Sequence, residues 1–345
     1  MLQVDNGTAF KVSFGVFPNE DGVECAYGVV KATFAISGKG EPTFCEEQSD
    51  IVPLDVPHGD PLTTSLRAAG EMTLVKPSTD ILLRGLAHAP GGRPAREVDV
   101  TLRVGSIAKT VRVFGDRVWE ARVLKARPSE PAPFETMPLI YERAFGGVDT
   151  DPVDPAKVDF EPRNPVGRGL VPTNARAGAE GRPLPNLEDP SALIRGPKDR
   201  PAPAGFGPVA PHWEPRKSYA GTYDEGWMKT RAPYLPRDFD PRFFQVAPPG
   251  LIAKEYLKGG EPVEILNATP SGRLSFNLPT CTPELIFLFD GREHRPPANL
   301  DTILFDTESG RLWMVWRACQ IVDKKLLRLD VIRARCPDHP KREGA

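Results

Sequence analysis

Alternating apolar and polar positions mark the N-terminal part of the chain. Apolar residues recur at every second position from 98 to 104, and a second alternating run covers residues 107–113. Side chains of a strand point to opposite faces in turn, so this period of two predicts strands with one buried face. Gly105-Ser106 separates the two runs and predicts a tight hairpin. A third run at 118–123, after Gly115-Asp116, predicts the next strand of a meander.

Short apolar runs return after residue 260. Turn residues separate them at the spacing expected of a sandwich or barrel. In the last run, Leu312, Met314 and Trp316 are expected to face one way, with Trp313 and Val315 on the other side. Further along, the sequence allows one more strand or a short helix, followed by a frayed polar tail. The runs lie at residues 263–266, 274–278, 285–289, 302–305 and 312–316.

The middle of the chain breaks this pattern. Residues 128–249 hold 23 of the 39 prolines. Proline lacks a backbone N–H and fixes φ, so long helices are excluded and any strand is confined to an edge or a bulge. The stretch is also rich in aromatic residues, which disordered tracts lack. It is therefore predicted to be an ordered, irregular coat over a β body.

The predicted fold is mainly β, with sandwich- or barrel-like sheets from both ends of the chain. We expect one domain over residues 1–345. It comprises an N-terminal β region (1–127), a Pro/Gly/aromatic-rich wrap (128–259), a C-terminal β region (260–335) and a tail (336–345). Within the wrap, Asp240-Pro241 predicts a capped short helix, and residues 250–257 predict another helical turn. The pattern leaves open whether the sheets share one core.

Composition narrows the class of protein. A formal charge of −2 gives no electrostatic case for nucleic acid or an acidic membrane as partner. No run approaches the roughly 20 apolar residues of a membrane span, and the N-terminus lacks the pattern of a signal peptide. The 5 scattered cysteines contain no CxxC pair, so reduced thiols in a cytoplasmic protein are expected.

Candidate chemistry is sparse. Glu135 and Glu142, or Asp238 and Asp240, would serve glycoside hydrolysis if each pair folded to about 5–10 Å apart, but neighbouring arginines favour internal ion pairs. The 5 histidines are isolated, so no metal or other cofactor is expected. Lys76 and Asp80 flank a proline turn; as a surface pair they would contribute about 0–1 kcal/mol.

Aromatic and arginine residues recur together through the wrap. These residue types dominate interface hot spots, because they bury large areas at little entropic cost. The same side chains also serve as pegs that hold an irregular segment to its core. Both interpretations stay open, and the candidate partner-binding residues are Tyr141, Arg143, Phe145, Trp213, Arg216, Tyr223, Trp227, Arg237, Phe239 and Phe243.

Several segments carry a family resemblance. They are TAF (8–10), VKATF (30–34), LVKPSTDILLRGLAHAP (74–90), VRVFGDRVW (111–119), MPLIYERAFGG (137–147), NPVGRG (164–169), LPNLEDP (184–190), PAGFGPVAPHWEPR (203–216), AGTYDEGW (220–227), LPRDFDPRFFQVAP (235–248) and LDTI (300–303). In order and number they make the chain resemble a bacterial family once catalogued only as a domain of unknown function, number twenty-one sixty-nine, and associated with type VI secretion.

The resemblance implies a cytoplasmic adaptor or chaperone, not an enzyme. Such a protein would bind a type VI effector, or its PAAR-like or spike-binding domain, and assist its loading onto the spike. No set of binding residues transfers from the family to this sequence. A carbohydrate-acting enzyme and a structural component of the secretion apparatus are the alternatives.

Overall fold

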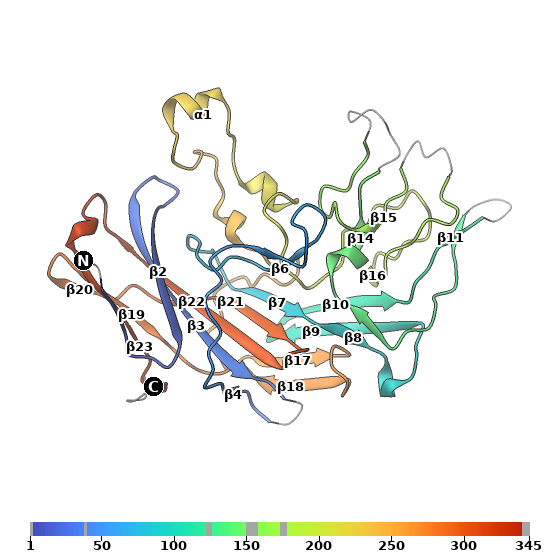
Figure 1. Cartoon of the computed structure of the whole chain (residues 1–345), viewed down its shortest axis with the longest axis horizontal. Coiled ribbons are helices and arrows are strands. Elements are labelled where there is room, and N and C mark those ends of the chain that lie inside the picture. The colour runs from blue at the N-terminus through green and yellow to red at the C-terminus, as the bar shows by residue number, and fades with distance from the viewer. Residues whose placement is uncertain (1–2, 38–39, 122–125, 150–157, 173–177, 340–345) are drawn as a thin grey trace.

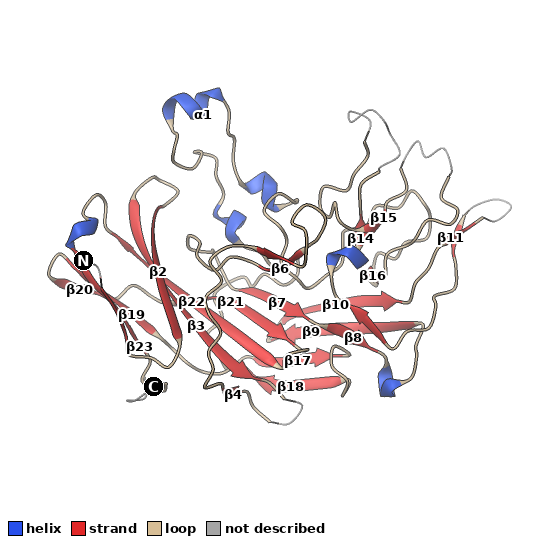
Figure 2. Ribbon diagram, viewed as in Figure 1, coloured by secondary structure: helices blue, strands red, loops and turns tan. Residues whose placement is uncertain are grey.

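The computed structural model describes residues 3–37, 40–121, 126–149, 158–172 and 178–339. Strands and irregular loops make up most of these residues, and the helices are short (Figure 2). Strand pairing divides them into several sheets, none of which closes into a barrel within the described residues. The predicted mainly β fold is confirmed, with open, sandwich-like sheets.

The largest sheet, here called the central sheet, combines strands from both ends of the chain (Figure 1). Its order is β2-β3-β22-β21-β7, and β4 pairs with the end of β3. β22 lies antiparallel between β3 and β21, so N-terminal and C-terminal residues pair directly. The strands are β2 (Lys11–Pro18), β3 (Glu24–Ala35), β4 (Thr43–Phe44), β7 (Asp80–Arg84), β21 (Asn299–Asp306) and β22 (Arg311–Ile321).

A second sheet contains the predicted hairpin. β9 (Glu97–Val104) and β10 (Ile107–Phe114) pair antiparallel, and Gly105 has the positive φ of 55° that the tight turn requires. The sheet continues to β17 (Pro262–Leu266) and β18 (Arg273–Asn277) on one side.

The predicted third strand of this meander is wrong. The neighbour of β10 is β16 (Leu187–Glu188), which comes from the wrap. β11 (Trp119–Glu120) instead pairs with β12 (Arg127–Pro128), and residues 122–123 lie outside the described residues. The wrap already occupies the open edge of β10, because Phe114 N donates to Asn186 O beside β16, so residues 118–121 have no free edge to pair with.

The third sheet joins the two ends of the chain. β1 (Gln3–Asn6) lies parallel to β23 (Leu329–Arg335), and β19 (Glu284–Phe289) and β20 (Arg292–His294) complete the order β1-β23-β19-β20. The last predicted strand is therefore present. The expected fraying does not begin at residue 336: Cys336 is buried, and the His339 ring lies 5.2 Å from that of Phe10.

The remaining elements are short. The paired strands are β5 (Val56–Pro57), β6 (Leu66–Ala68), β8 (Leu86–His88), β13 (Thr136–Pro138), β14 (Phe145–Gly146) and β15 (Arg168–Gly169). The helices are η1 (Pro90–Gly92), η2 (Tyr141–Arg143), η4 (Arg216–Tyr219), α1 (Glu225–Thr230), η5 (Pro241–Phe244) and η6 (Leu326–Arg328).

One continuous core contains side chains from all three larger sheets and the wrap. Leu312, Met314 and Trp316 belong to it, whereas Trp313 and Val315 line a cavity on the other face of β22. The predicted alternation along this strand is confirmed. The N-terminal and C-terminal sheets therefore share one core.

The wrap covers an edge of the central sheet. The backbone N–H groups of Ile81 and Leu83 on β7 donate to Leu251 O and Phe206 O. These bonds satisfy backbone N–H groups of an edge strand that would otherwise be free to pair with another chain. The helical turn predicted at 250–257 is absent, because this backbone is used for such contacts: Ala253 N also donates to Thr79 O.

Candidate functional site

Four of the ten predicted binding residues are buried and anchor the wrap to the core. Tyr141 and Trp213 meet edge to face, with ring centroids 5.5 Å apart, and Phe145 lies in a second apolar cluster. Burial also lowers the pKa of the Arg216 guanidinium, which donates to Val209 O (2.6 Å) and Phe243 O (2.8 Å). These side chains fix the wrap to the body and present little surface to a partner. Arg143 is partly buried and donates to Asp116 and Asn186.

The other five lie on or beside a projection of the wrap, residues 219–240, which we call the arm (Figure 1). Hydrogen bonds close its base. Asp240 N donates to Tyr219 O at 3.0 Å, and Thr222 donates from N and Oγ1 to the Asp238 carboxylate at 3.0 and 2.7 Å. These bonds lower the pKa of Asp238. The arm is therefore a closed loop with a defined neck.

Local capping and ring contacts order the tip of the arm. The Asp224 carboxylate accepts from Trp227 N at 2.8 Å and caps α1. Trp227 Nε1 donates to Tyr234 O at 2.8 Å, and the Tyr223 and Trp227 rings lie 4.8 Å apart, edge to face. A helix of 6 residues is marginal alone, so these contacts are what hold it.

The arm also touches the turn between β2 and β3. The Arg231 guanidinium donates to Glu20 O at 2.5 Å and to Asp21 O at 3.2 Å. The Tyr234 ring lies so close to Gly22 that a Cβ there would be 3.1 Å from it. The arm thus packs against the tip of the β2–β3 hairpin.

Apolar surface remains exposed on the arm despite this order. Tyr223 is 53% exposed and Met228 is 69% exposed. Arg237 is exposed and makes no hydrogen bond or ion pair with any described residue. An ordered aromatic group beside an unpaired arginine has the composition of an interface hot spot.

Packed aromatic side chains support the base of the arm. Phe239 and Phe243 have ring centroids 5.7 Å apart, and the Arg242 guanidinium lies 4.4 Å from the Tyr219 ring. The predicted cap is confirmed: Asp240 Oδ1 accepts from Arg242 N at 2.9 Å at the start of η5, a 3-10 helix. Hydrogen bonds from the Arg242 side chain lower the pKa of Asp240.

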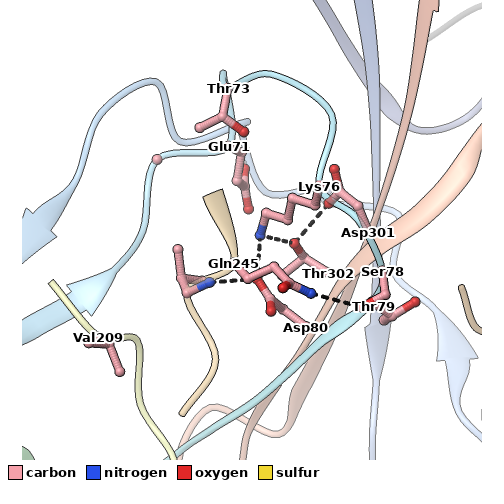
Figure 3. Close-up of polar contacts among 12 residues, drawn as sticks. Glu71, Thr73, Lys76, Ser78, Thr79, Asp80, Val209, Gln245, Asp301 and Thr302 are labelled. Atoms are coloured by element: carbon pink, nitrogen blue, oxygen red, sulfur yellow. Dashed lines mark hydrogen bonds and ion pairs between the residues drawn. The ribbon is translucent and has the colours of Figure 1, made fainter. Parts of the chain in front are cut away.

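A buried polar network lies under the wrap (Figure 3). Lys76 Nζ lies 2.8 Å from Asp80 Oδ2, with the two side chains 4% and 0% exposed, and it also donates to Thr302 Oγ1 at 2.8 Å. Asp80 Oδ2 accepts a second bond from Val246 N, at 2.8 Å. The expectation of a weak surface pair is therefore wrong. The adjoining apolar run from Ile81 was the available signal, since it places Asp80 at the start of a buried strand.

The same loop ties the wrap to the central sheet. Gln245 donates to Ser78 Oγ at 2.8 Å, and Ser78 donates to Ala253 O at 2.6 Å. Thr79 accepts from Leu257 N at 2.8 Å while donating to Leu300 O at 2.5 Å. Hydroxyl groups of one loop thus hold irregular backbone of the wrap against the central sheet. We call this loop, residues 76–80, the clamp.

Three of the four predicted acids have hydrogen-bond partners, whereas Glu135 is exposed. The Glu142 carboxylate accepts from Ser65 N and Ser65 Oγ, both at 2.7 Å. Asp240 and Asp238 bond to Arg242 and Thr222 as described above. No group of three or more His, Cys, Asp or Glu side chains in the described residues is arranged to hold a metal ion.

Comparison with known proteins identifies the family. A family model described as an uncharacterized protein conserved in bacteria, DUF2169, matches residues 21–317. The chain belongs to this family. The match includes the Lys76–Asp80 clamp and the whole arm. No curated protein and no solved structure matches the chain.

One further finding concerns membranes. Among the helices that the structure describes, none has both the length and the apolar character needed to cross a bilayer.

Proposed function

We propose that this DUF2169 member is a cytoplasmic adaptor that binds a type VI secretion effector, or its PAAR-like or spike-binding domain, and assists its loading onto the spike. The observation that supports binding is the arm: an ordered projection with exposed Tyr223 and Met228, and with Arg237, which has no ion-pair partner among the residues that the structure describes. The type VI context comes from the sequence resemblance described above.

The arm suits a stoichiometric binder on energetic grounds. Its closed neck and capped helix fix its shape before a partner arrives, which reduces the ordering cost of association. Exposed aromatic side chains then supply apolar area, and Arg237 supplies a directed polar contact. Binding of this kind would mask apolar surface or an open strand edge on the cargo until the spike takes it over.

Co-purification of the full chain with the product of the adjacent gene tests the proposal. We expect a stable complex, and we expect Tyr223→Ala or Arg237→Ala to weaken it by about 1–4 kcal/mol. Leu327→Ala is the matched control, because Leu327 is 99% exposed and lies outside the arm. If the arm variants leave the affinity of the complex unchanged, the interface must lie elsewhere on the protein.

Two other outcomes would replace the proposal. Hydrolysis of glycans that is lost in Glu142→Ala or Asp240→Ala would favour the carbohydrate enzyme. Recovery of the chain in the secreted fraction with the needle would favour a structural component, because an adaptor stays behind.

A further inference from the structure

A trough crosses the outer face of the central sheet, opposite the core. Residues 49–71 form a strap over β7, β21 and β22, and two adjoining cavities of about 240 Å³ and 570 Å³ lie beside it. Arg67 and Arg84 line both cavities. The cavities therefore meet at these two arginines.

The smaller cavity has an apolar floor. Trp313 and Val315 on β22 point into it because their neighbours on the strand face the core. Leu82 and Leu304 add to this floor from β7 and β21, and Val246 adds to it from the wrap. Its volume is below the 300–1,000 Å³ usual for small-molecule sites, and it fits one large side chain.

Most charges around this cavity are already neutralised. Lys31 pairs with Glu71 at 2.8 Å, and the Arg84–Asp306 pair closes at 2.5 Å. Lys76, which pairs with Asp80, lies on the same wall. Arg67 differs: it is exposed and has no hydrogen-bond or ion-pair partner among the described residues.

The strap is fixed without a ligand. Val52 N donates to Glu71 Oε2 at 2.7 Å, and Glu71 N donates back to Val52 O at 2.7 Å. Ser65 is anchored to Glu142 on the other side. A preformed cavity beside an unpaired guanidinium favours an apolar group next to a carboxylate, which arginine binds in a bidentate manner.

We propose that this trough binds an extended segment of the cargo protein, placing one large apolar side chain in the Trp313 cavity and an adjacent carboxylate against Arg67. The larger cavity takes the backbone that follows, and the exposed Glu308 on its wall favours a neutral or basic continuation. This inference rests on the proposed adaptor function and names a second contact apart from the arm.

A peptide titration tests the site with the full chain. The probe is acetyl-Gly-Ser-Phe-Asp-Ser-Gly-amide, labelled for fluorescence anisotropy. The comparison peptide has Asn in place of Asp. We expect the Asp peptide to bind at least about tenfold more tightly, because a hydrogen bond to a charged group contributes about 1.5–3 kcal/mol. Arg67→Ala should remove this difference, and Ala68→Trp, which fills the smaller cavity, should abolish binding.

Controls separate the possible failures. Arg93→Ala removes an exposed arginine outside both cavities and should leave peptide binding unchanged. Equal binding of the Asp and Asn peptides, or no effect of Arg67→Ala, would overturn the inference. Binding of 3-phenylpropionate as tight as that of the peptide would also overturn it, in favour of a free small acid.

The cargo experiment distinguishes this inference from the proposed function. If the adjacent gene product co-purifies with wild type but less with Arg67→Ala, both stand. If it co-purifies equally with Arg67→Ala and Ala68→Trp, the trough is refuted and the adaptor function remains. If no complex forms with the wild-type chain, the adaptor function fails.

Discussion

The buried pair Lys76–Asp80 carries the sharpest prediction about stability. Both side chains are almost inaccessible, and Asp80 Oδ1 has no hydrogen-bond partner in the described residues. Lys76→Met would leave Asp80 buried with only the Val246 N–H to bond its charge. Removal of one member of a buried pair costs about 3–5 kcal/mol, so we expect a loss of at least about 3 kcal/mol.

The partner variants refine this figure. Asp80→Ala leaves Lys76 with Thr302 alone and orphans the Val246 N–H, so it should cost at least as much. The double variant Lys76→Met with Asp80→Leu removes both charges, and its cost should fall to about 1–3 kcal/mol, that of the orphaned N–H. A double-mutant cycle then gives the coupling energy of the pair.

Urea denaturation followed by tryptophan fluorescence and far-UV circular dichroism measures these free energies of unfolding. The matched control is Lys229→Met, which breaks an i,i+4 pair with Glu225 whose side chains are 73% and 90% exposed. We expect it to cost about 0.5 kcal/mol or less. If Lys76→Met lowers the free energy of unfolding by less than about 1 kcal/mol, the pair contributes no more than a surface pair does. That result would refute the claim that the pair is a buried, stabilising contact.

Three further predictions address pH, packing and the arm. Partial burial is the main cause that lowers the pKa of His88, so the unfolded chain binds more protons, and stability should fall as pH drops below about 6.5; His88→Gln should flatten this fall in urea titrations. Gly115→Ala should cost about 1–3 kcal/mol or more in the same assay, since its Cβ would lie 1.7 Å from Ala132 O, whereas the control Gly196→Ala meets no atom closer than 3.9 Å and has no positive φ. Replacement of residues 223–233 by a short Gly/Ser linker should abolish cargo co-purification. It should change the free energy of unfolding by less than about 1 kcal/mol, because most of these residues are exposed. A larger loss of stability would contradict the interpretation of the arm as a separate projection.

Local pattern was enough to predict much of the fold. The β9–β10 hairpin, the facing of residues along β22 and the Asp240 cap each depend on neighbours within a few residues. Period-two alternation, turn chemistry and capping act at this range, so the sequence states them directly. The composition of the wrap likewise predicted irregular backbone, because proline acts on its own residue and the one before it.

The candidate site depended on distant partners. Trp213 and Trp227 have the same residue type and lie in the same wrap, yet one is a buried peg and the other packs on an exposed arm. The trough likewise joins Arg67 to Trp313 across most of the chain. No local pattern encodes which residues meet in this way.

By itself, the sequence determined a β body with alternating strands, a stiff proline-rich wrap and the absence of long helices, since these follow from short-range sterics and hydrogen bonding. Only the tertiary structure decided that β3 pairs with β22, that the wrap supplies β16, and that Lys76 and Asp80 are buried. Strand partners and burial are set by the packing of the whole chain, in which residues hundreds of positions apart exclude water from one another.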